Sequence, residues 1–243
     1  MNIILIVFLL MMIYFLFYLY KLYKKEGPEY IIEKIAVIFN KIYAYNSLVG
    51  NKPYYTDTIL KESHILTQNF SIFREEVLKT YKSYKTIKGD LFFNDIVNNK
   101  NDWKKLYIKW HSDIDPYAKK ICPKTCKIIE SLPNVKVAMF SVLSPGAKIP
   151  MHRGPYKGFL RYHLGILTPN SPDCFINVND IKYSWKDGEG IVFDDTFIHW
   201  VENNTDKTRI ILFCDIIRPM NFIGKNINTF IIKYICPYTT RSN

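Results

Sequence analysis

The chain has 243 residues, which is enough for one domain with appendages or for two small domains. Its composition, 48% hydrophobic and 23% charged, excludes a fully disordered protein, and its 10 glycines and 12 prolines exclude a fibrous or low-complexity one. The net charge of +11 raises nucleic acid and anionic membranes as partners, but 27 of the 33 cations are dispersed lysines without a basic-aromatic RNA motif, so no nucleic-acid partner is expected.

Residues 3–20 form an uncharged apolar run that lacks glycine and proline. A helix over this run would be about 27 Å long, enough to cross the hydrocarbon core of a bilayer. A cleaved signal peptide is disfavoured, because no basic residue precedes the run and no small-residue cleavage site follows it. Lys21, Lys24 and Lys25 come directly after it, so the positive-inside rule predicts a single-pass anchor with the rest of the chain in the cytosol.

The cysteines agree with a cytosolic location for the folded body. Their number, five, is odd, and no two of them form a CxxC pair. The sequence therefore predicts neither a disulfide framework nor a zinc site. The expected location is a single-pass membrane protein, and the sequence leaves the oligomeric state open.

Three segments after the anchor have helical patterns. Residues 30–45 place isoleucines at nearly helical intervals, and residues 71–84 begin with Ser71 as a predicted N-cap. Residues 121–132 end just before Pro133, which is typical of a helix terminus. These patterns predict helices on the N-terminal side of the folded body.

Strand-like runs begin at Val135 and alternate with turn residues. The predicted strands are residues 135–143, 158–167, 174–178, 181–185, 190–195, 196–202 and 208–217. Asn179 and Asp180 are typical of a tight hairpin turn between two of them. Several short strands at regular spacing predict a mainly β fold, either a sandwich or a jelly-roll barrel.

These changes in pattern define the expected domain organisation. The parts are a transmembrane anchor at 1–22, a juxtamembrane helical linker at 23–50, a helical region at 51–134, the β core at 135–225 and a C-terminal tail at 226–243. The helical region is expected to belong to the same folded body as the β core. Its Trp103, Trp110 and His111 are expected to pack against the barrel rather than to line a substrate groove.

Two predicted strands place arginine among apolar residues. Because strand side chains alternate between faces, Arg161 and His163 share one face of their strand, and Arg209 lies inside another strand. A buried arginine needs an anionic partner. That partner is either an acidic side chain of the protein or the carboxylate of a ligand held by the guanidinium fork. The candidate acidic side chains are Asp194, Asp195 and Asp215.

Two histidines and an arginine follow one another in a specific order. His199 comes 47 residues after His152, and Arg209 comes ten residues after His199. Fe(II)/2-oxoglutarate oxygenases use this order on a double-stranded β-helix, where imidazoles suit Fe(II) and the arginine pairs with a carboxylate of 2-oxoglutarate. The carboxylate ligand expected two residues after the first histidine is missing, because that position is Gly154. Either water fills the position, or the metal site is weak, or the pattern does not mark a metal site.

Four segments are specific enough to compare with a known family. They read PKTCKIIESLPNVKVAMFSVLSPGAKIPMHRGP, LRYHLGILTPN, YSWKDGEGIVFDDTFIHWVENNT and RIILFCDIIRP, and they lie between Cys122 and Pro219. They resemble the aspartyl/asparaginyl β-hydroxylase family, which includes lipid A acyl-chain hydroxylases. The resemblance implies a double-stranded β-helix of the jelly-roll or cupin-like type that uses Fe(II), 2-oxoglutarate and O2.

The resemblance also implies a role for each matching residue. His152 and His199 would bind the iron. The residues that would hold 2-oxoglutarate are Ser141, Arg161, His163 and Arg209, with Arg209 on the distal carboxylate. Peptide hydroxylases of the family also have glycine at the place of Gly154 and work with two histidine ligands, whereas the lipid branch carries Asp there. A water in the third position would give Asp195 a supporting catalytic role behind the ligands.

The implied reaction couples oxidative decarboxylation of 2-oxoglutarate to the hydroxylation of an unactivated carbon. The first interpretation is a membrane-anchored hydroxylase of peptide Asp or Asn side chains. The second is a hydroxylase of a lipid acyl chain, which the anchor, the cytosolic orientation and the segment HRGPYKGFLRYHLGILTPN favour. The third is a catalytically inactive barrel that serves as a binding module, which Gly154 favours and the retained histidines and arginines oppose.

Overall fold

The computed structural model describes residues 27–80, 103–111 and 113–234, together with Tyr14, Phe17, Tyr20, Lys21, Lys24 and Lys25. The chain divides into a unit of residues 1–42 and a larger unit of residues 43–243. Helix α2 (Pro28–Asn46) covers the helix predicted at 30–45 and ends inside the larger unit. The anchor predicted at 3–20 lies almost wholly outside the described residues. No helix in the described part of the chain is both long enough and apolar enough to span a bilayer.

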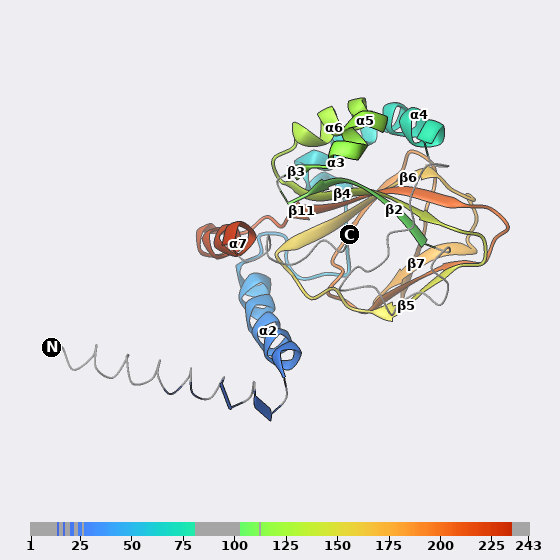
Figure 1. The fold of residues 1–243 in the computed structure, drawn as a ribbon. Helices are drawn as coiled ribbons and strands as arrows, with labels where there is room; N and C mark the ends of the chain where they lie inside the picture. Colours follow the sequence, from blue (N-terminus) through green and yellow to red (C-terminus); the bar gives the residue numbers. More distant parts are fainter. Residues whose placement is uncertain are drawn as a thin grey trace. The chain divides into compact units, whose positions relative to one another are not determined.

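Two sheets build the larger unit (Figure 1). One sheet contains β1 (Tyr54–Tyr55), β2 (Trp103–Trp110), β3 (Asp113–Ile114), β4 (Val135–Leu143), β6 (Phe159–Leu167), β9 (Gly190–Phe193) and β11 (Arg209–Ile217). The other contains β5 (Lys148–His152), β7 (Cys174–Val178), β8 (Ile181–Ser184) and β10 (His199–Asn203). Neighbouring strands in both sheets pair antiparallel.

Strands β4 to β11 form a double-stranded β-helix. Their order is β9-β6-β11-β4 in the larger sheet and β5-β10-β7-β8 in the smaller one, so the chain passes between the sheets at most of its turns. Strand β1 extends the larger sheet beyond β9, and β2 and β3 extend it beyond β4. The mainly β, jelly-roll fold predicted from the sequence is therefore confirmed.

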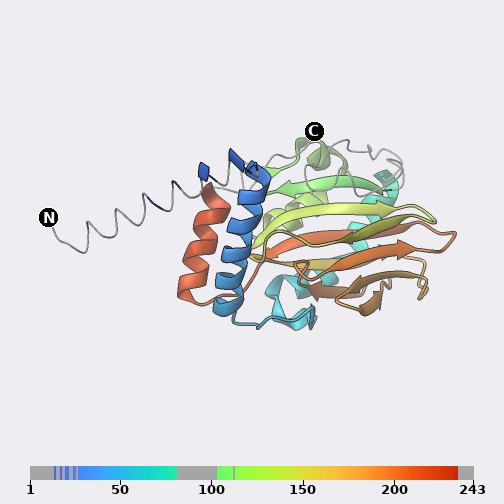
Figure 2. The same cartoon turned by 90° about the horizontal axis from the view of Figure 1, so that it is seen from below.

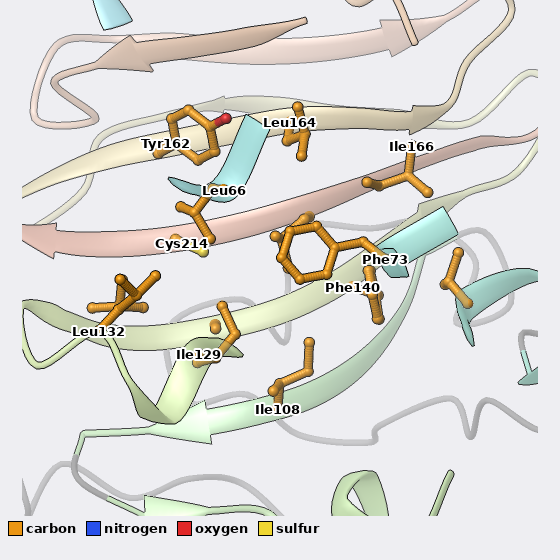
Figure 3. Packing of buried hydrophobic residues seen from close by; sticks show 14 of the residues in the cluster. Leu66, Phe73, Ile108, Ile129, Leu132, Phe140, Tyr162, Leu164, Ile166 and Cys214 are labelled. Carbon is orange, nitrogen blue, oxygen red and sulfur yellow. The ribbon is translucent and has the colours of Figure 1, made fainter. Parts of the chain in front are cut away.

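Helices cover the outer face of the larger sheet (Figure 1). They are α3 (Lys61–Gln68), α4 (Phe70–Thr80), α5 (Pro116–Ile121) and α6 (Pro123–Glu130), and a short 3-10 helix, η1 (Asp57–Ile59), precedes them. Leu164 and Ile166 of β6 are fully buried in one core cluster with Phe73 of α4 and Ile129 of α6 (Figure 3). Burial of each such side chain contributes about 1.5–3 kcal/mol. The alternate residues of β6 therefore face the space between the two sheets.

The region expected to be helical, residues 51–134, also contains β2, which is a strand in the interior of the larger sheet. The pairing of β2 with β4 shifts register between Tyr107 and Lys109, and this bulge interrupts the alternation of apolar and polar residues. The helix predicted at 121–132 is α6, which begins two residues later at Pro123, while a separate helix, α5, ends at Ile121. Proline fits the first turn of a helix but not its interior.

The segment expected to be a C-terminal tail is largely helical. Helix α7 (Phe222–Tyr234) starts shortly after the end of β11. Figures 1 and 2 both show α7 at one end of the strands rather than on a face of a sheet. Its side chain Asn228 donates to the backbone carbonyl of Gly158 at 2.9 Å and also bonds the hydroxyl of Tyr156. These contacts fix α7 against the loop between β5 and β6.

Candidate active site

The predicted histidine pair lies on neighbouring strands of the smaller sheet. His152 is the last residue of β5, not a loop residue as its sequence suggested, and His199 is the first residue of β10. The two residues are register partners, and their ring centroids are 4.1 Å apart. Strand pairing therefore brings together two imidazoles that are distant in sequence.

Both imidazoles have a fixed tautomer. Nδ1 of His152 is 2.8 Å from the carbonyl oxygen of Pro150, and Nδ1 of His199 is 2.9 Å from that of Phe197. A carbonyl oxygen only accepts, so each Nδ1 carries the proton and each Nε2 presents its lone pair. Burial lowers the pKa of His152, and burial together with His152 lowers the pKa of His199 to about 3. Two neutral imidazoles whose Nε2 atoms carry a lone pair are suitable metal ligands.

Gly154 makes room for a carboxylate. A Cβ atom at position 154 would lie 2.0 Å from Oδ2 of Asp195, a separation that real atoms do not adopt. The amide of Gly154 also donates to the backbone carbonyl of Asp195 at 2.8 Å. The carboxylate of Asp195 thus fills the space that the first atom of any side chain at position 154 would need. Glycine at this position is required by the local packing.

Arg161 lies between two carboxylates. Its Nη2 is 2.9 Å from Oδ2 of Asp195, and its Nε is 2.9 Å from Oδ1 of Asp215, its register partner on β11. Burial lowers the pKa of Arg161, but Asp195 and Asp215 outweigh this effect and raise it overall. Burial raises the pKa of Asp195 to about 6, although the charge of Arg161 opposes the shift. Of the two partners expected for a buried arginine, an acidic side chain or a ligand carboxylate, Arg161 has the first.

Arg209 has no such partner. Its side chain is only 1% exposed, and no acidic side chain among the described residues forms an ion pair with it. Its Nη2 donates to Oγ of Ser141 at 3.1 Å, while its Nε–H has no partner. Burial lowers the pKa of Arg209 to about 10. A buried guanidinium without a counter-charge, beside a hydroxyl, fits a carboxylate ligand.

His163 lies between the histidine pair and Arg209 in an aromatic setting. Its ring centroid is 4.9 Å from that of Phe193 and 5.2 Å from that of Phe213. Both of its ring nitrogens are buried without a hydrogen-bond partner in the described structure. Burial and the charge of Arg161 hold the pKa of His163 well below its usual value, so the ring is neutral. A buried imidazole with two unused nitrogens can serve a polar ligand.

One cavity between the two sheets joins these side chains. Six of the seven predicted site residues line it, namely Ser141, His152, Arg161, His163, His199 and Arg209. The remaining lining is aromatic or aliphatic and consists of Trp103, Met139, Ile149, Ile176, Phe193, Val201, Ile211 and Phe213. Asp195 does not line the cavity but holds Arg161 from behind. The cavity is therefore apolar, with a few polar groups at defined places.

The donor set suits a metal with two protein ligands. No group of three or more histidine, cysteine, aspartate or glutamate side chains in the described part of the chain could hold a metal ion together. The cavity instead offers two nitrogen ligands, Nε2 of His152 and Nε2 of His199. This pair fits Fe(II) with its other positions open to small ligands.

The sequence comparisons now identify the family. Residues 57–219, more than half of the chain, match the family described as Aspartyl/Asparaginyl beta-hydroxylase. The chain belongs to this family. The family resemblance noted in the sequence is therefore confirmed, and the β-hydroxylase match extends from η1 to the end of β11.

Two relatives illustrate the range of this β-hydroxylase family. The "Ornithine lipid ester-linked acyl 2-hydroxylase" of Rhizobium tropici is 30% identical over 187 residues, which are 74% of this chain and 66% of that protein. The human "Aspartyl/asparaginyl beta-hydroxylase" is 29% identical over 161 residues, which are 63% of this chain and 21% of that protein. The chain thus spans just under two thirds of the first and about a fifth of the second. Among solved structures, a Pseudomonas putida prolyl-4-hydroxylase matches with a TM-score of 0.43 and 12% identity, over 76% of this chain and 99% of that chain.

The sequence did not indicate two aromatic members of the site. Trp103, expected to pack against the barrel, lines the cavity and donates its indole N–H to Oγ of Ser141 at 2.8 Å. Trp185 packs its ring 4.8 Å from the guanidinium carbon of Arg209. The alternation of side chains along β2 would have shown that Trp103 faces the cavity only if the bulge between Tyr107 and Lys109 had been known. Trp185 directly follows β8, at the last position of the strand predicted at 181–185, and its contact with Arg209 depends on the fold.

Proposed function

We propose that the protein is an Fe(II)- and 2-oxoglutarate-dependent hydroxylase that acts on the acyl chain of a membrane lipid. It belongs to a family of hydroxylases, and its cavity combines a histidine pair, an unpaired buried arginine and an apolar lining. The observation that carries the substrate class is this apolar lining, because it offers contact to a hydrocarbon, while Arg209, the cavity arginine without an acidic partner among the described residues, is assigned to the co-substrate.

The iron would be held by His152 and His199 through Nε2. When bound, it would supply the activation of O2 that inserts oxygen into an unactivated C–H bond, with 2-oxoglutarate as the co-substrate that is oxidised to succinate and CO2. The protein holds both imidazoles in the ligating tautomer through the carbonyls of Pro150 and Phe197. Asp195 orients Arg161 beside this site, and Gly154 allows it to do so.

2-Oxoglutarate would be held at the opposite end of the cavity. Arg209 would pair with its distal carboxylate, which supplies the counter-charge that the protein lacks there. Ser141 and His163 are the neighbouring polar groups for the rest of the molecule. Trp103 holds the hydroxyl of Ser141 in place by donating to it. Arg161 remains a candidate for the other carboxylate, although Asp195 and Asp215 already neutralise it.

Most of the cavity lining is apolar. Met139, Ile149, Val201 and Phe213 belong to this lining. The charge of Arg161, the nearest cavity-lining cation, is taken up by two carboxylates. Burial of a methylene group in such a lining contributes about 0.8 kcal/mol, which favours an acyl chain. The relative from Rhizobium tropici, named as an acyl 2-hydroxylase, supports the same choice.

The membrane is also where such a substrate is found. The uncharged run at 3–20 would anchor the chain, and the three lysines after it would keep the catalytic unit in the cytosol. In this arrangement the lipid does not have to leave the bilayer completely to reach the enzyme.

Hydroxylation of a peptide Asp or Asn side chain is the second candidate function. It is favoured by the similarity to the human aspartyl/asparaginyl beta-hydroxylase and by glycine at position 154, where the resemblance places glycine in the peptide hydroxylases. A peptide substrate would need polar partners for its side chain, and the cavity supplies few of them around the histidine pair.

Turnover by the full-length chain in detergent tests the proposal. We expect succinate formation that requires Fe(II), 2-oxoglutarate and O2, and that is lost in His152→Ala and His199→Ala but kept in the control His64→Ala, whose histidine is exposed on α3. Mass spectrometry should find one added oxygen on an acylated lipid. Oxygen added to a peptide instead would establish the second candidate, and no turnover with any substrate would establish an inactive barrel that acts as a binding module.

A further inference from the structure

Helix α7 exposes its most apolar side chains. Phe222 is 82% exposed, Ile223 is 61% exposed and Phe230 is 57% exposed, and Tyr234 extends the same surface with its ring 5.0 Å from that of Phe230. Positions 223, 230 and 234 are separated by seven and four residues and therefore share one helix face, and Phe222 is exposed at the start of the helix. A helix on a water-soluble surface would bury these residues and expose its polar ones.

The face that α7 turns to the body of the protein consists of Gly224, Asn228 and Ile231, the buried residues of the helix. Asn228 makes the contacts with Tyr156 and Gly158, so hydrogen bonds as well as the packing of Ile231 fix the helix. The exposed apolar side chains are thus not the by-product of loose docking, because a different face of the helix fits the protein.

A second exposed segment adjoins the start of α7. The amide of Asn221 donates to the carbonyl of Asn46 at 3.0 Å, and the amide of Leu48 donates to that of Pro219 at 3.0 Å. Tyr45 is 89% exposed and Leu48 is 70% exposed. We call Tyr45, Leu48, Phe222, Ile223, Phe230 and Tyr234 together the α7 surface. It includes residues at and just after the end of α2, where the larger unit begins in the sequence.

The α7 surface lies at the end of the barrel that carries the histidine pair. Arg161 and Asp215 lie near the end of β11 that leads into α7, whereas Arg209 begins β11 at the far end. Asp195, which pairs with Arg161, contacts Gly154 in the loop that follows His152, and α7 packs on the same loop at Gly158. A partner on the α7 surface would therefore lie next to the histidine end of the cavity.

We propose that the α7 surface lies in the interface of a lipid bilayer and presents the histidine end of the cavity to it. Aromatic and aliphatic residues with lysines beside them are the composition of interfacial helices, and α7 carries Lys225 and Lys233 and no acidic residue. The uncharged run at 3–20, on the same chain, supplies a reason for a bilayer to be near. The benefit of this placement rests on the proposed function, because a bilayer at this end of the cavity would supply acyl chains as substrate.

Depth-dependent fluorescence quenching tests this placement without any need for catalysis. The full-length chain is reconstituted into vesicles of phosphatidylcholine and phosphatidylglycerol in equal parts, with or without brominated acyl chains. Tryptophan is introduced as Phe230→Trp and, as the matched control, as Asp206→Trp in the exposed loop between β10 and β11 at the far end of the barrel. The emission of the native tryptophans is subtracted by use of the unsubstituted protein.

We expect brominated lipid to quench the tryptophan at 230 about twofold more than the one at 206, because aromatic residues of an interfacial helix reach the acyl boundary. Equal quenching at the two positions would overturn the proposal. The proposal would also be overturned if lipid did not quench the tryptophan at 230 and self-association of the protein shielded it from solvent. The α7 surface would then bind a second copy of the chain.

A second variant separates this inference from the proposed function. Phe222→Ser with Phe230→Ser changes only exposed side chains, so thermal unfolding should stay the same. Hydroxylation of lipid in vesicles should fall about tenfold, while hydroxylation of detergent-dispersed lipid should not change. Equal activity of the variant and the unsubstituted protein on vesicles would overturn the role of the surface. Selective quenching at 230 in a protein that hydroxylates no lipid would uphold the α7 surface and reject the substrate class.

Discussion

Arg209 carries its positive charge in a place where the described residues provide no counter-charge. The guanidinium is 1% exposed, and its donors find only the hydroxyl of Ser141 among the described residues. Arg161, in contrast, is held by Asp195 and Asp215. Arg161 and Arg209 both lie in predicted strands, but only Arg209 lacks an acidic partner among the described residues. The difference makes Arg209 the residue on which 2-oxoglutarate binding depends most strongly.

Replacing Arg209 by methionine should separate stability from co-substrate binding. Without 2-oxoglutarate, Arg209→Met should unfold at the same temperature as the unsubstituted protein or at a higher one, because a buried unpaired charge is removed. Binding of 2-oxoglutarate should weaken about 100-fold, so the rise in melting temperature on its addition should disappear. Thermal unfolding with and without 2-oxoglutarate measures both effects. Arg153→Met, at an exposed position, is the control, and a normal co-substrate shift in Arg209→Met would contradict the assignment.

The contact between Gly154 and Asp195 explains a residue that the sequence left open. Gly154 was compatible with a water in the site, a weak site or no metal site at all. In the structure its missing side chain is the space that the Asp195 carboxylate fills. Position 154 could not be interpreted from the sequence, because Asp195 is 41 residues away and only the fold brings the two together.

The energetic coupling of these two positions can be measured. Gly154→Ala should reduce the free energy of unfolding by about 2 kcal/mol, because the new methyl group overlaps the carboxylate. In the Asp195→Ala background the same change should cost close to nothing, because the overlapping atoms are gone. Urea unfolding of the two single variants and the double variant gives the coupling term. Additive effects would show that Asp195 is not what makes alanine costly at position 154.

At the scale of the element, the loop between β9 and β10 is held by a buried ion cluster. Oδ2 of Asp194 is 2.5 Å from Nζ of Lys157 and 2.5 Å from Nη2 of Arg218, and its Oδ1 accepts from the amide of Thr196. The cluster joins this loop to the β5–β6 loop and to the end of β11. The loop carries Asp195 and leads into His199, so the cluster fixes the parts of the site that come from different elements.

Arg218→Met should therefore be costly. It leaves a fully buried carboxylate with one cation instead of two, and breaking a buried ion pair costs about 3 kcal/mol or more in free energy of unfolding. The matched control is Arg74→Met, which breaks the partly exposed pair with Asp187 and should cost about 1 kcal/mol or less. Denaturant unfolding of the two variants compares them directly. Equal costs would mean that the cluster does not hold the loop more firmly than a surface pair does.

The elements that the sequence predicted well are those whose patterns are uninterrupted. Strand β4 has the predicted bounds, and β6 and β11 begin one residue later than predicted, because their alternation is regular and both ends are marked. Strand β2 was missed since its bulge breaks the alternation. Strand β5 was not predicted, and its Pro150 is tolerated since β5 is the edge strand of its sheet.

At the scale of the whole molecule, the sequence indicated which residues meet but not what lies between them. The order of His152, His199 and Arg209 together with the family resemblance predicted a shared site, and six of the seven predicted residues line one cavity. The apolar wall of that cavity comes from seven strands of two sheets and has no signature in any one of them. The α7 surface was also not predicted. Its helix was expected to be a C-terminal tail, and which of its side chains are exposed depends on which helix face packs against the rest of the protein.

The anchor is the last feature of the whole molecule that a single experiment decides. After alkaline carbonate extraction of membranes, the full-length protein should remain in the membrane pellet, because an uncharged run of this length is retained by the hydrocarbon core. Leu9→Arg with Met12→Arg places two charges in the run, each at a cost of about 3 kcal/mol, and should move the protein to the supernatant. Leu9→Ala with Met12→Ala is the control and should stay in the pellet. Extraction of the unsubstituted protein into the supernatant would reject the anchor, and the α7 surface would then be the contact with the bilayer that remains to be tested.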